Sequence, residues 1–310
     1  MQLYCVVTVD TEPDCSTSWR RSDPLQFSSV TQGVPQLLRP IWDRFGVRPV
    51  YFVSPEVVED RQSCESLSQE KTKGAEIGAH LHAEYVEPMK KYSHYNGTRS
   101  DEYPCYAYDL STEYKKIQTL TAMIGERLGV NPTSYRAARF GADGDTWQSL
   151  QSLGYHVDSS VTPGIDWSYQ GGPNFRQYPV QPYFINKENT QRFSEPLLEV
   201  PITIQGKRFA FAPDRWLWYR WLRPTHMSAY EQRRLIDDTI RLYRSNDYVV
   251  FCLMFHSMEI IPRATPYTRS EWSVAWYVRR LTKVLDGLAL KGCSFVTLEE
   301  LYQIYASHRI

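Results

Sequence analysis

Residues 76–84 read Glu76-Ile77-Gly78-Ala79-His80-Leu81-His82-Ala83-Glu84, a short apolar run that ends in two histidines and an acid. Side chains of an extended segment alternate between its two faces, so the imidazoles of His80 and His82 point the same way. This spacing is typical of metal ligands, but ordinary buried or exposed histidines show it as well. Other groups of suitable chemistry must join these two before a metal site is indicated.

Two further candidate positions lie at the ends of strand-like runs. Residues 3–9 form a β-branched apolar run that predicts a buried strand, and this strand ends at Asp10 and Glu12. Residues 248–255 predict another strand, which ends at His256. Groups at the C-terminal ends of successive parallel strands meet at one mouth of a barrel. We therefore expect these residues to gather with the two histidines.

The composition is that of a globular protein with a sizeable core. The chain has 310 residues, of which 42% are apolar and 23% charged, enough for one large α/β domain or two ordinary ones. Lysine plus arginine and aspartate plus glutamate both number 35. The net charge therefore gives no indication of a nucleic-acid partner or an anionic membrane surface, and we expect no nucleic-acid partner.

Targeting and redox signals are weak throughout. The N-terminus lacks a basic segment followed by an apolar segment of signal-peptide length, and no apolar run approaches the roughly 18–20 residues of a membrane span. The six cysteines are scattered without a CxxC pair, so neither a zinc ribbon nor a disulfide scaffold is predicted. We expect a cytoplasmic protein without a transmembrane segment.

Strand-like and helical segments alternate along the whole chain. Apolar residues recur with helical spacing in residues 34–45 and 114–128, and Gly46 and Gly129 follow the ends of these segments. About seven such strand and helix units predict a parallel sheet curled into an α/β barrel. Nothing indicates a second domain, so residues 1–310 are predicted to form a single one.

Three segments do not follow this alternation. Residues 85–111 and 159–195 are irregular and rich in aromatic side chains, and we expect them to form long loops at the C-terminal face of the barrel. Residues 215–223 alternate aromatic and basic side chains. This piece either meets a membrane interface or a lipid-linked substrate, or it packs its rings inward and extends its arginines to solvent, which we favour.

Five motifs occur in one order along the chain, at the ends of predicted strands. They are Val9-Asp10-Thr11-Glu12, Gly78-Ala79-His80-Leu81-His82, Arg136-Ala137-Ala138-Arg139-Phe140-Gly141, Asp158 with Asp166-Trp167, and Leu253-Met254-Phe255-His256-Ser257. Together they resemble the polysaccharide deacetylase family, carbohydrate esterase family 4, in a divergent bacterial-type form. The resemblance spans most of the chain. It implies a distorted (β/α) barrel that uses a divalent metal, usually zinc, to remove an acyl group from an amino sugar.

The resemblance also implies catalytic roles. Asp10 would be the general base that takes a proton from the attacking water, and His256 the general acid that protonates the departing amine. Arg136 would hold the base in place, and Asp158 or Asp166 would orient His256. This division of labour suits the reaction, because an amide is a poor electrophile with a poor leaving group and requires both a base and an acid.

The metal ligands depart from the commonest family pattern. That pattern has a second aspartate directly after the first, but Thr11 stands here and the acid follows as Glu12. Its second histidine lies four residues after the first, where this chain has Glu84. We assign Glu12, His80 and His82 as ligands, with Glu84 as the alternative to His82, because imidazole suits zinc and alternate strand residues face the same way. Cobalt and nickel are alternatives to zinc.

The remaining motif residues are expected to contact substrate. They are Glu84, Arg139, Phe140, Gly141 and Trp167. The backbone near Phe140 and Gly141 is expected to offer a hydrogen-bond donor to the developing oxyanion, since glycine permits close approach.

We therefore expect a metal-dependent hydrolase that removes an N-acyl group, most simply acetyl, from a sugar. Its partner would be an amino-sugar-containing glycan of a surface polysaccharide, or a nucleotide- or lipid-linked precursor. Two alternatives remain open. One is a non-catalytic carbohydrate-binding protein on the same fold, and the other is a hydrolase of another C–N bond, in a formamide or a cyclic amide.

Overall fold

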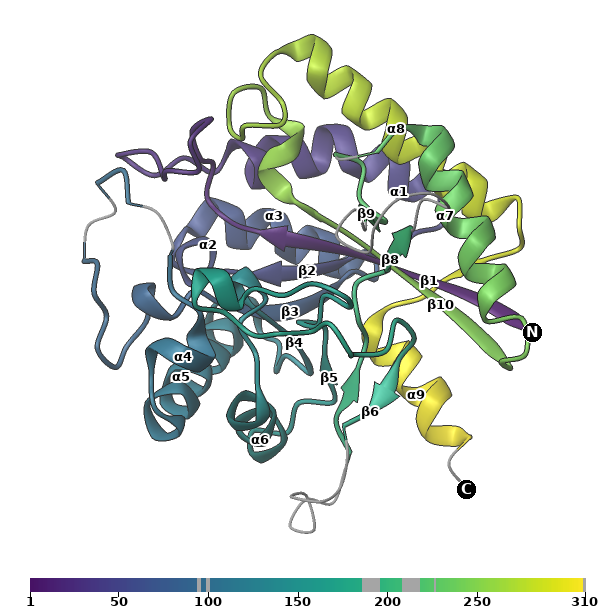
Figure 1. Ribbon diagram of the computed structural model, residues 1–310. Coiled ribbons are helices and arrows are strands. Elements are labelled where there is room, and N and C mark those ends of the chain that lie inside the picture. The colour runs from purple at the N-terminus through teal and green to yellow at the C-terminus, as the bar shows by residue number, and fades with distance from the viewer. Residues whose placement is uncertain (94–95, 99–100, 186–195, 208–217, 226, 309–310) are drawn as a thin grey trace.

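One curled β-sheet runs through the centre of the molecule (Figure 1). A computed structural model of the chain describes residues 1–93, 96–98, 101–185, 196–207, 218–225 and 227–308. Within these residues the sheet has nine strands. Eight follow the order β10 (Tyr248–His256), β1 (Gln2–Thr11), β2 (Val50–Val53), β3 (Glu76–Leu81), β4 (Ser134–Ala137), β5 (Val157–Asp158), β7 (Leu198–Glu199) and β6 (Tyr183–Phe184), and β11 (Ser294–Phe295) pairs with β1.

Neighbouring strands along this path are parallel from β10 to β7, and β6 runs antiparallel to β7. In the described part of the chain the path therefore contains seven mutually parallel strands. Its two ends, β10 and β6, do not pair with each other there, so the sheet forms a half-barrel. This architecture confirms the predicted distorted (β/α) barrel of about seven parallel strands.

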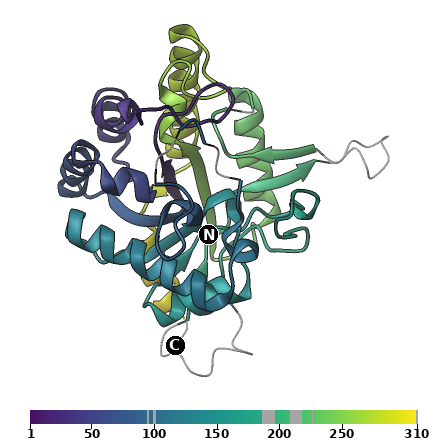
Figure 2. The same ribbon diagram turned by 90° about the vertical axis from the view of Figure 1, so that its left-hand side faces the viewer.

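Helices are arranged around the outside of the strands (Figure 2). They are η1 (Ser29–Leu38), α1 (Arg39–Phe45), α2 (Pro55–Glu59), α3 (Arg61–Thr72), α4 (Pro104–Ala107), α5 (Leu110–Leu128), α6 (Gly144–Ser152), α7 (Ala229–Leu242) and α8 (Glu271–Ala289), whereas α9 (Leu298–Ser307) packs against the cluster of side chains on the other face of the sheet. Gly46 and Gly129 end α1 and α5 with φ of +64° and +61°, as predicted from their positions. Only glycine adopts this left-handed backbone without strain.

Strand β1 is buried on both faces, which explains its continuous apolar sequence. Cys5, Val7 and Val9 belong to the core cluster that includes the helices around the sheet, whereas Tyr4 and Val6 belong to a second cluster inside the curl. Continuing the alternation, Asp10 lies on the inner side. The strand therefore carries an acid to the inside of the half-barrel at its C-terminal end.

The segment of residues 215–223 lies partly outside the described residues, which resume at Trp218. Strand β9 (Trp218–Trp221) pairs with β8 (Ile204–Lys207) as a separate two-stranded sheet. Tyr219 and Trp221 pack against the second core cluster, and Arg220 and Arg223 are buried. The inward packing of the rings is confirmed for Tyr219 and Trp221, but the expectation that the arginines extend to solvent is wrong for Arg220 and Arg223. None of the described helices has an apolar stretch of membrane-spanning length.

Candidate metal centre and active site

A polar cavity of about 190 Å³ opens at the C-terminal ends of β1, β3 and β10. Acidic, basic, imidazole and aromatic side chains share its wall. Among the described residues the lining is Asp10, Glu12, Cys15, Trp19, Arg21, His80, His82, Ala137, Arg139, Phe140 and His256. The two histidines of residues 76–84 thus meet residues at the C-terminal ends of β1 and β10.

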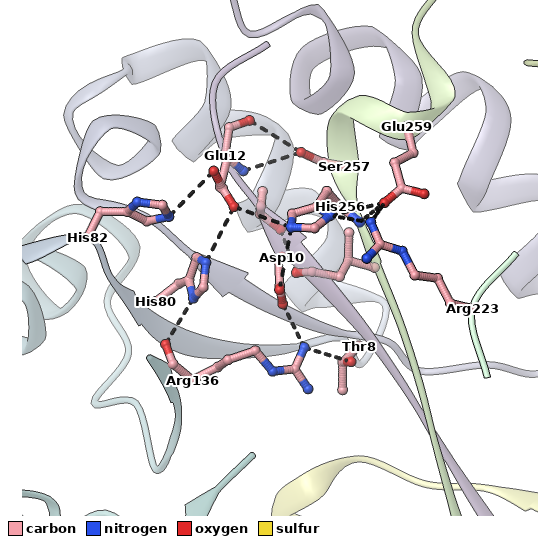
Figure 3. A network of polar contacts seen from close by, with 12 residues as sticks. Thr8, Asp10, Glu12, His80, His82, Arg136, Arg223, His256, Ser257 and Glu259 are labelled. Carbon is pink, nitrogen blue, oxygen red and sulfur yellow. Dashed lines mark hydrogen bonds and ion pairs between the residues drawn. The ribbon is translucent and has the colours of Figure 1, made fainter. Parts of the chain in front are cut away.

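The Glu12 carboxylate faces both imidazoles (Figure 3). Glu12 Oε1 is 3.4 Å from His80 Nε2, and Glu12 Oε2 is 3.4 Å from His82 Nε2. One ligand atom from each of the three residues lies within 4.8 Å of the others, and all three residues are buried. One carboxylate and two imidazoles form a ligand set for zinc that leaves coordination positions open. These residues therefore fit a divalent metal.

The period-two geometry of β3 produces this arrangement. His80 is in the strand and His82 follows its last residue, whereas Leu81 between them belongs to the core cluster on the other face. Burial by itself raises the pKa of Glu12, but the two histidines outweigh it and hold that pKa well below its usual range. Burial lowers the pKa of His80, but Asp10 and Glu12 outweigh it and leave that pKa raised.

Arg136 is fully buried and holds Asp10. Its Nη1 donates to Asp10 Oδ1 at 2.6 Å and to Thr8 Oγ1 at 2.9 Å, and its Nε donates to the Ser159 carbonyl at 2.8 Å. The guanidinium lies 4.5 Å above the centre of the Phe52 ring. Burial raises the pKa of Asp10, but Arg136 and the neighbouring histidines outweigh it, so the pKa is lowered. Asp10 is therefore ionised near neutral pH.

His256 faces Asp10 of β1 and Glu12, which directly follows that strand. Its Nε2 lies 4.0 Å from Asp10 Oδ2 and 3.8 Å from Glu12 Oε1. Its Nδ1 lies 3.0 Å from Glu259 Oε1, and Arg223 Nη2 lies 3.0 Å from the same nitrogen. Arg223 also forms an ion pair with Glu259. Burial raises the pKa of Glu259, but Arg223 and His256 outweigh it, so the pKa is lowered and the group is an anionic acceptor.

The expectation that Asp158 or Asp166 orients His256 is wrong, because Glu259 lies at Nδ1 instead. Asp158 accepts hydrogen bonds from Trp147 Nε1 at 2.8 Å and Ser160 Oγ at 2.6 Å. Asp166 accepts from the Ser168 backbone and pairs with Arg176. Glu259 was missed although it follows His256 by three residues, a spacing that returns a side chain to its neighbour within one helical turn.

Some of the residues expected to contact substrate line the cavity, and others pack behind its wall. Arg139 and Phe140 line the cavity with φ of +53° and +61°, a strained backbone for residues with side chains that is often found at functional sites. Trp167 does not line it, but stacks on Phe140 with ring centres 6.2 Å apart. The indole therefore supports the ring that faces the cavity.

Gly141 and Glu84 lie away from the cavity wall. The Gly141 N–H donates to the Ala138 carbonyl at 3.0 Å, so this N–H is already engaged, and an oxyanion donor from the Phe140 backbone stays a prediction. A Cβ at this position would lie 2.8 Å from Pro104 Cδ, which explains the glycine by close packing. Glu84 is buried and does not line the cavity, and the metal-ligand group contains His82 in its place.

Arg21 is a cavity residue that the sequence did not indicate. Its Nε donates to Glu56 Oε1 at 2.6 Å, and its Nη2 lies 3.2 Å from His82 Nδ1 and 3.7 Å from Glu12 Oε2. The guanidinium also lies 4.3 Å above the centre of the Tyr85 ring. Arg21 comes from a polar loop without periodicity, so no sequence pattern pointed to it.

The chain is similar to known proteins in its fold but not in its sequence. No family model matches the chain, and no curated protein matches its sequence. A probable polysaccharide deacetylase from Pseudomonas aeruginosa PAO1 has a TM-score of 0.59 at 12% identity, covering 99% of this chain and 91% of that one. A candidate polysaccharide deacetylase from Mycobacterium smegmatis has a TM-score of 0.54 at 15% identity, with 99% and 91% covered. An allantoinase has a TM-score of 0.56 at 10% identity, again with 99% and 91% covered.

The sheet is thus a curled half-barrel with a Glu-His-His group at its strand ends, and not the open sheet of a nucleotide-binding fold. More narrowly, the chain has the (β/α) barrel fold of the polysaccharide deacetylases. This structural similarity supports the family resemblance of the sequence motifs.

Proposed function

We propose that the chain is a metal-dependent hydrolase that removes an N-acyl group, most simply acetyl, from a sugar. The observation that carries this proposal is the convergence of Asp10 and His256 on one cavity beside the group of Glu12, His80 and His82. The structural neighbours include polysaccharide deacetylases, which supports sugar deacetylation as the general activity.

Glu12, His80 and His82 would hold the divalent metal. Zinc suits two imidazoles and a carboxylate best, with cobalt or nickel as alternatives. When bound, such a metal supplies Lewis acidity that activates water and polarises the amide carbonyl. The protein contributes the fixed position of the ligands, since the Arg136 carbonyl lies 2.9 Å from His80 Nδ1 and orients that ring.

Asp10 and His256 would move the protons. Asp10 is held ionised by Arg136, so it accepts the proton of the attacking water. His256 donates a proton to the departing nitrogen, and Glu259 positions its ring from the other side. The separation of 4.0 Å between Asp10 Oδ2 and His256 Nε2 allows one small substrate group to touch both.

The sugar would lie against the aromatic side of the cavity. Trp19 and Phe140 line it, with Trp167 behind Phe140, and flat rings of this kind suit the apolar face of a sugar. Arg139 adds a donor at the same wall.

Three further proposals stay predictions from the sequence. The substrate is a glycan or a nucleotide- or lipid-linked precursor. Residues 1–310 form one domain, and the protein is cytoplasmic.

The test is release of acetate from a panel of N-acetylated sugars, oligosaccharides and nucleotide-linked sugars, with the protein loaded with zinc, cobalt or nickel. Metal-dependent acetate release supports the proposal. Tight glycan binding without turnover, by protein that carries no metal after purification without chelators, favours the non-catalytic binding protein instead.

A second candidate is hydrolysis of another C–N bond, in a formamide or a cyclic amide. The structural likeness to an allantoinase favours it, because that enzyme shares the fold over nearly the whole chain. Turnover of a cyclic amide by a metal-loaded protein that leaves all N-acetyl sugars untouched would select this candidate.

A further inference from the structure

The two histidines of the metal group have opposite neighbours at Nδ1. His80 Nδ1 lies 2.9 Å from the carbonyl oxygen of Arg136, which only accepts hydrogen bonds. His82 Nδ1 lies 3.2 Å from Arg21 Nη2, which only donates. Histidines that bind metals almost always donate the proton of their other nitrogen to an acceptor. His80 follows that rule, and the contact of His82 with Arg21 opposes it.

These neighbours place the ring protons differently. A neutral imidazole carries one proton, so His80 donates from Nδ1 and keeps the Nε2 lone pair on the side of Glu12. His82 accepts from Arg21 at Nδ1, and its proton lies on Nε2, which is 3.4 Å from Glu12 Oε2. In this arrangement the His82 nitrogen nearest Glu12 has no lone pair to offer a metal.

Arg21 is fixed where it lies. Its side chain is 2% exposed, its Nε donates to Glu56 Oε1 at 2.6 Å, and its guanidinium stacks over Tyr85. Because an arginine stays charged, a permanent positive charge lies beside the group that would receive a cation. The charge also lies 3.7 Å from Glu12 Oε2, where it competes for the same carboxylate.

We propose that Arg21 is a positioning residue that lowers the affinity of this site for divalent metal. Binding through His82 Nε2 requires the hydrogen bond between Arg21 and His82 to break, and like charges then lie close together in a buried place. Glu12 and His80 can bind the metal without this change, so Arg21 lowers the affinity through His82. The inference rests on the proposed metal site.

The test removes Arg21 together with its buried partner. Arg21→Gln alone would leave the Glu56 carboxylate buried and unpaired, which destabilises proteins strongly, so the variant is Arg21→Gln with Glu56→Gln. The matched control is Arg39→Gln with Glu70→Gln, a buried pair 3.5 Å apart that does not line the cavity. Zinc and cobalt dissociation constants are measured at one pH by competition with a chromogenic chelator.

We expect the Arg21/Glu56 variant to bind metal about 10–100-fold more tightly than the unchanged protein. Neighbours of metal ligands usually change affinity by this factor, and here the change is a gain because Arg21 opposes metal binding by His82. The control should bind as the unchanged protein does. Equal or weaker binding by the Arg21/Glu56 variant overturns the inference.

His80→Ala separates this inference from the proposed function. If the unchanged protein binds metal and His80→Ala does not, the site stands, and an Arg21/Glu56 variant of equal affinity overturns the role of Arg21 alone. If neither the unchanged protein nor the Arg21/Glu56 variant binds metal, the proposed site and the role of Arg21 are overturned together.

Discussion

Asp10 and His256 are register partners on the neighbouring parallel strands β1 and β10, and their side chains approach to 4.0 Å. The pairing brings together strands that are far apart in the sequence, because β1 is the first strand and, among the described strands, only the short β11 follows β10. A proton acceptor and a proton donor are thus placed by the backbone ladder itself. Their separation therefore does not depend on the path of a long loop.

Glu259→Gln should lower kcat about 100-fold with little change in KM, because His256 loses the carboxylate that orients it. Steady-state kinetics of acetate release measures both constants. Asp158→Asn is the control, since Asp158 contacts Trp147 and Ser160, and it should keep near-normal kcat. The reverse ranking, with the Asp158 variant inactive and the Glu259 variant active, would contradict the assignment.

Gly78→Ala should destabilise the protein by about 1–3 kcal/mol, the usual cost of overpacking. The added Cβ would lie 2.6 Å from Phe52 Cδ1, and Phe52 lies beneath Arg136. The substitution should therefore also reduce activity through Asp10. Urea unfolding measures the loss against Gly144→Ala, whose Cβ meets nothing within 4 Å. Equal stability of the two variants would show that Phe52 can move without cost.

The unfolding free energy should depend on the ionisation of Glu113, whose pKa is raised by burial to about 8. In the unfolded chain its pKa is about 4.3, so the folded state holds the proton more tightly between these values. Stability from this group is complete below about pH 4.3 and is lost as pH rises towards 8.

Glu113→Gln removes this dependence while keeping an acceptor for Thr146 Oγ1, which donates to Glu113 Oε1 at 2.7 Å. Relative to the unchanged protein, the variant should gain stability between pH 5 and pH 8, by up to about 4 kcal/mol, because one pKa unit corresponds to about 1.4 kcal/mol. Urea unfolding at the two pH values gives the difference. A constant offset between the proteins would mean that Glu113 does not titrate in this range.

His80→Ala should lose bound metal while the protein stays folded. The side chain supplies one ligand atom of the three and takes no part in the main core clusters. Elemental analysis after gel filtration measures the metal, and circular dichroism checks the fold. His156→Ala is a suitable control, since His156 pairs with Glu299 on α9 and does not line the cavity. Full metal content in the His80 variant would count against the ligand set.

The parts of the fold that repeat with a regular period could be predicted from the sequence. The continuous apolar run of the buried strand β1 and the apolar spacing of α5 follow from strand and helix geometry, and Gly129 marks an end that glycine favours. The position of the polar residues after β1, β3 and β10 follows from the rule that parallel strands end at one face. These local rules were enough to gather the candidate site.

The neighbours of the site residues could not be predicted, because they depend on how loops return in three dimensions. Arg21 reaches His82 after the chain turns back through a bridge between Cys15 and Arg21, and no periodic pattern encodes that path. Asp158 and Glu259 both lie near predicted strand ends, so sequence position did not separate them. Their hydrogen bonds separate them, because Asp158 accepts from Trp147 Nε1 whereas Glu259 lies at His256 Nδ1.

The most direct measurement is acetate release by metal-loaded Asp10→Asn protein compared with the unchanged protein. Asparagine keeps the size of the side chain but cannot take the proton of the attacking water, so kcat should fall at least about 100-fold with the metal still bound. An Asp10→Asn protein that retains its metal and turns over at the normal rate would contradict the assignment of Asp10 as the base, and with it the mechanism.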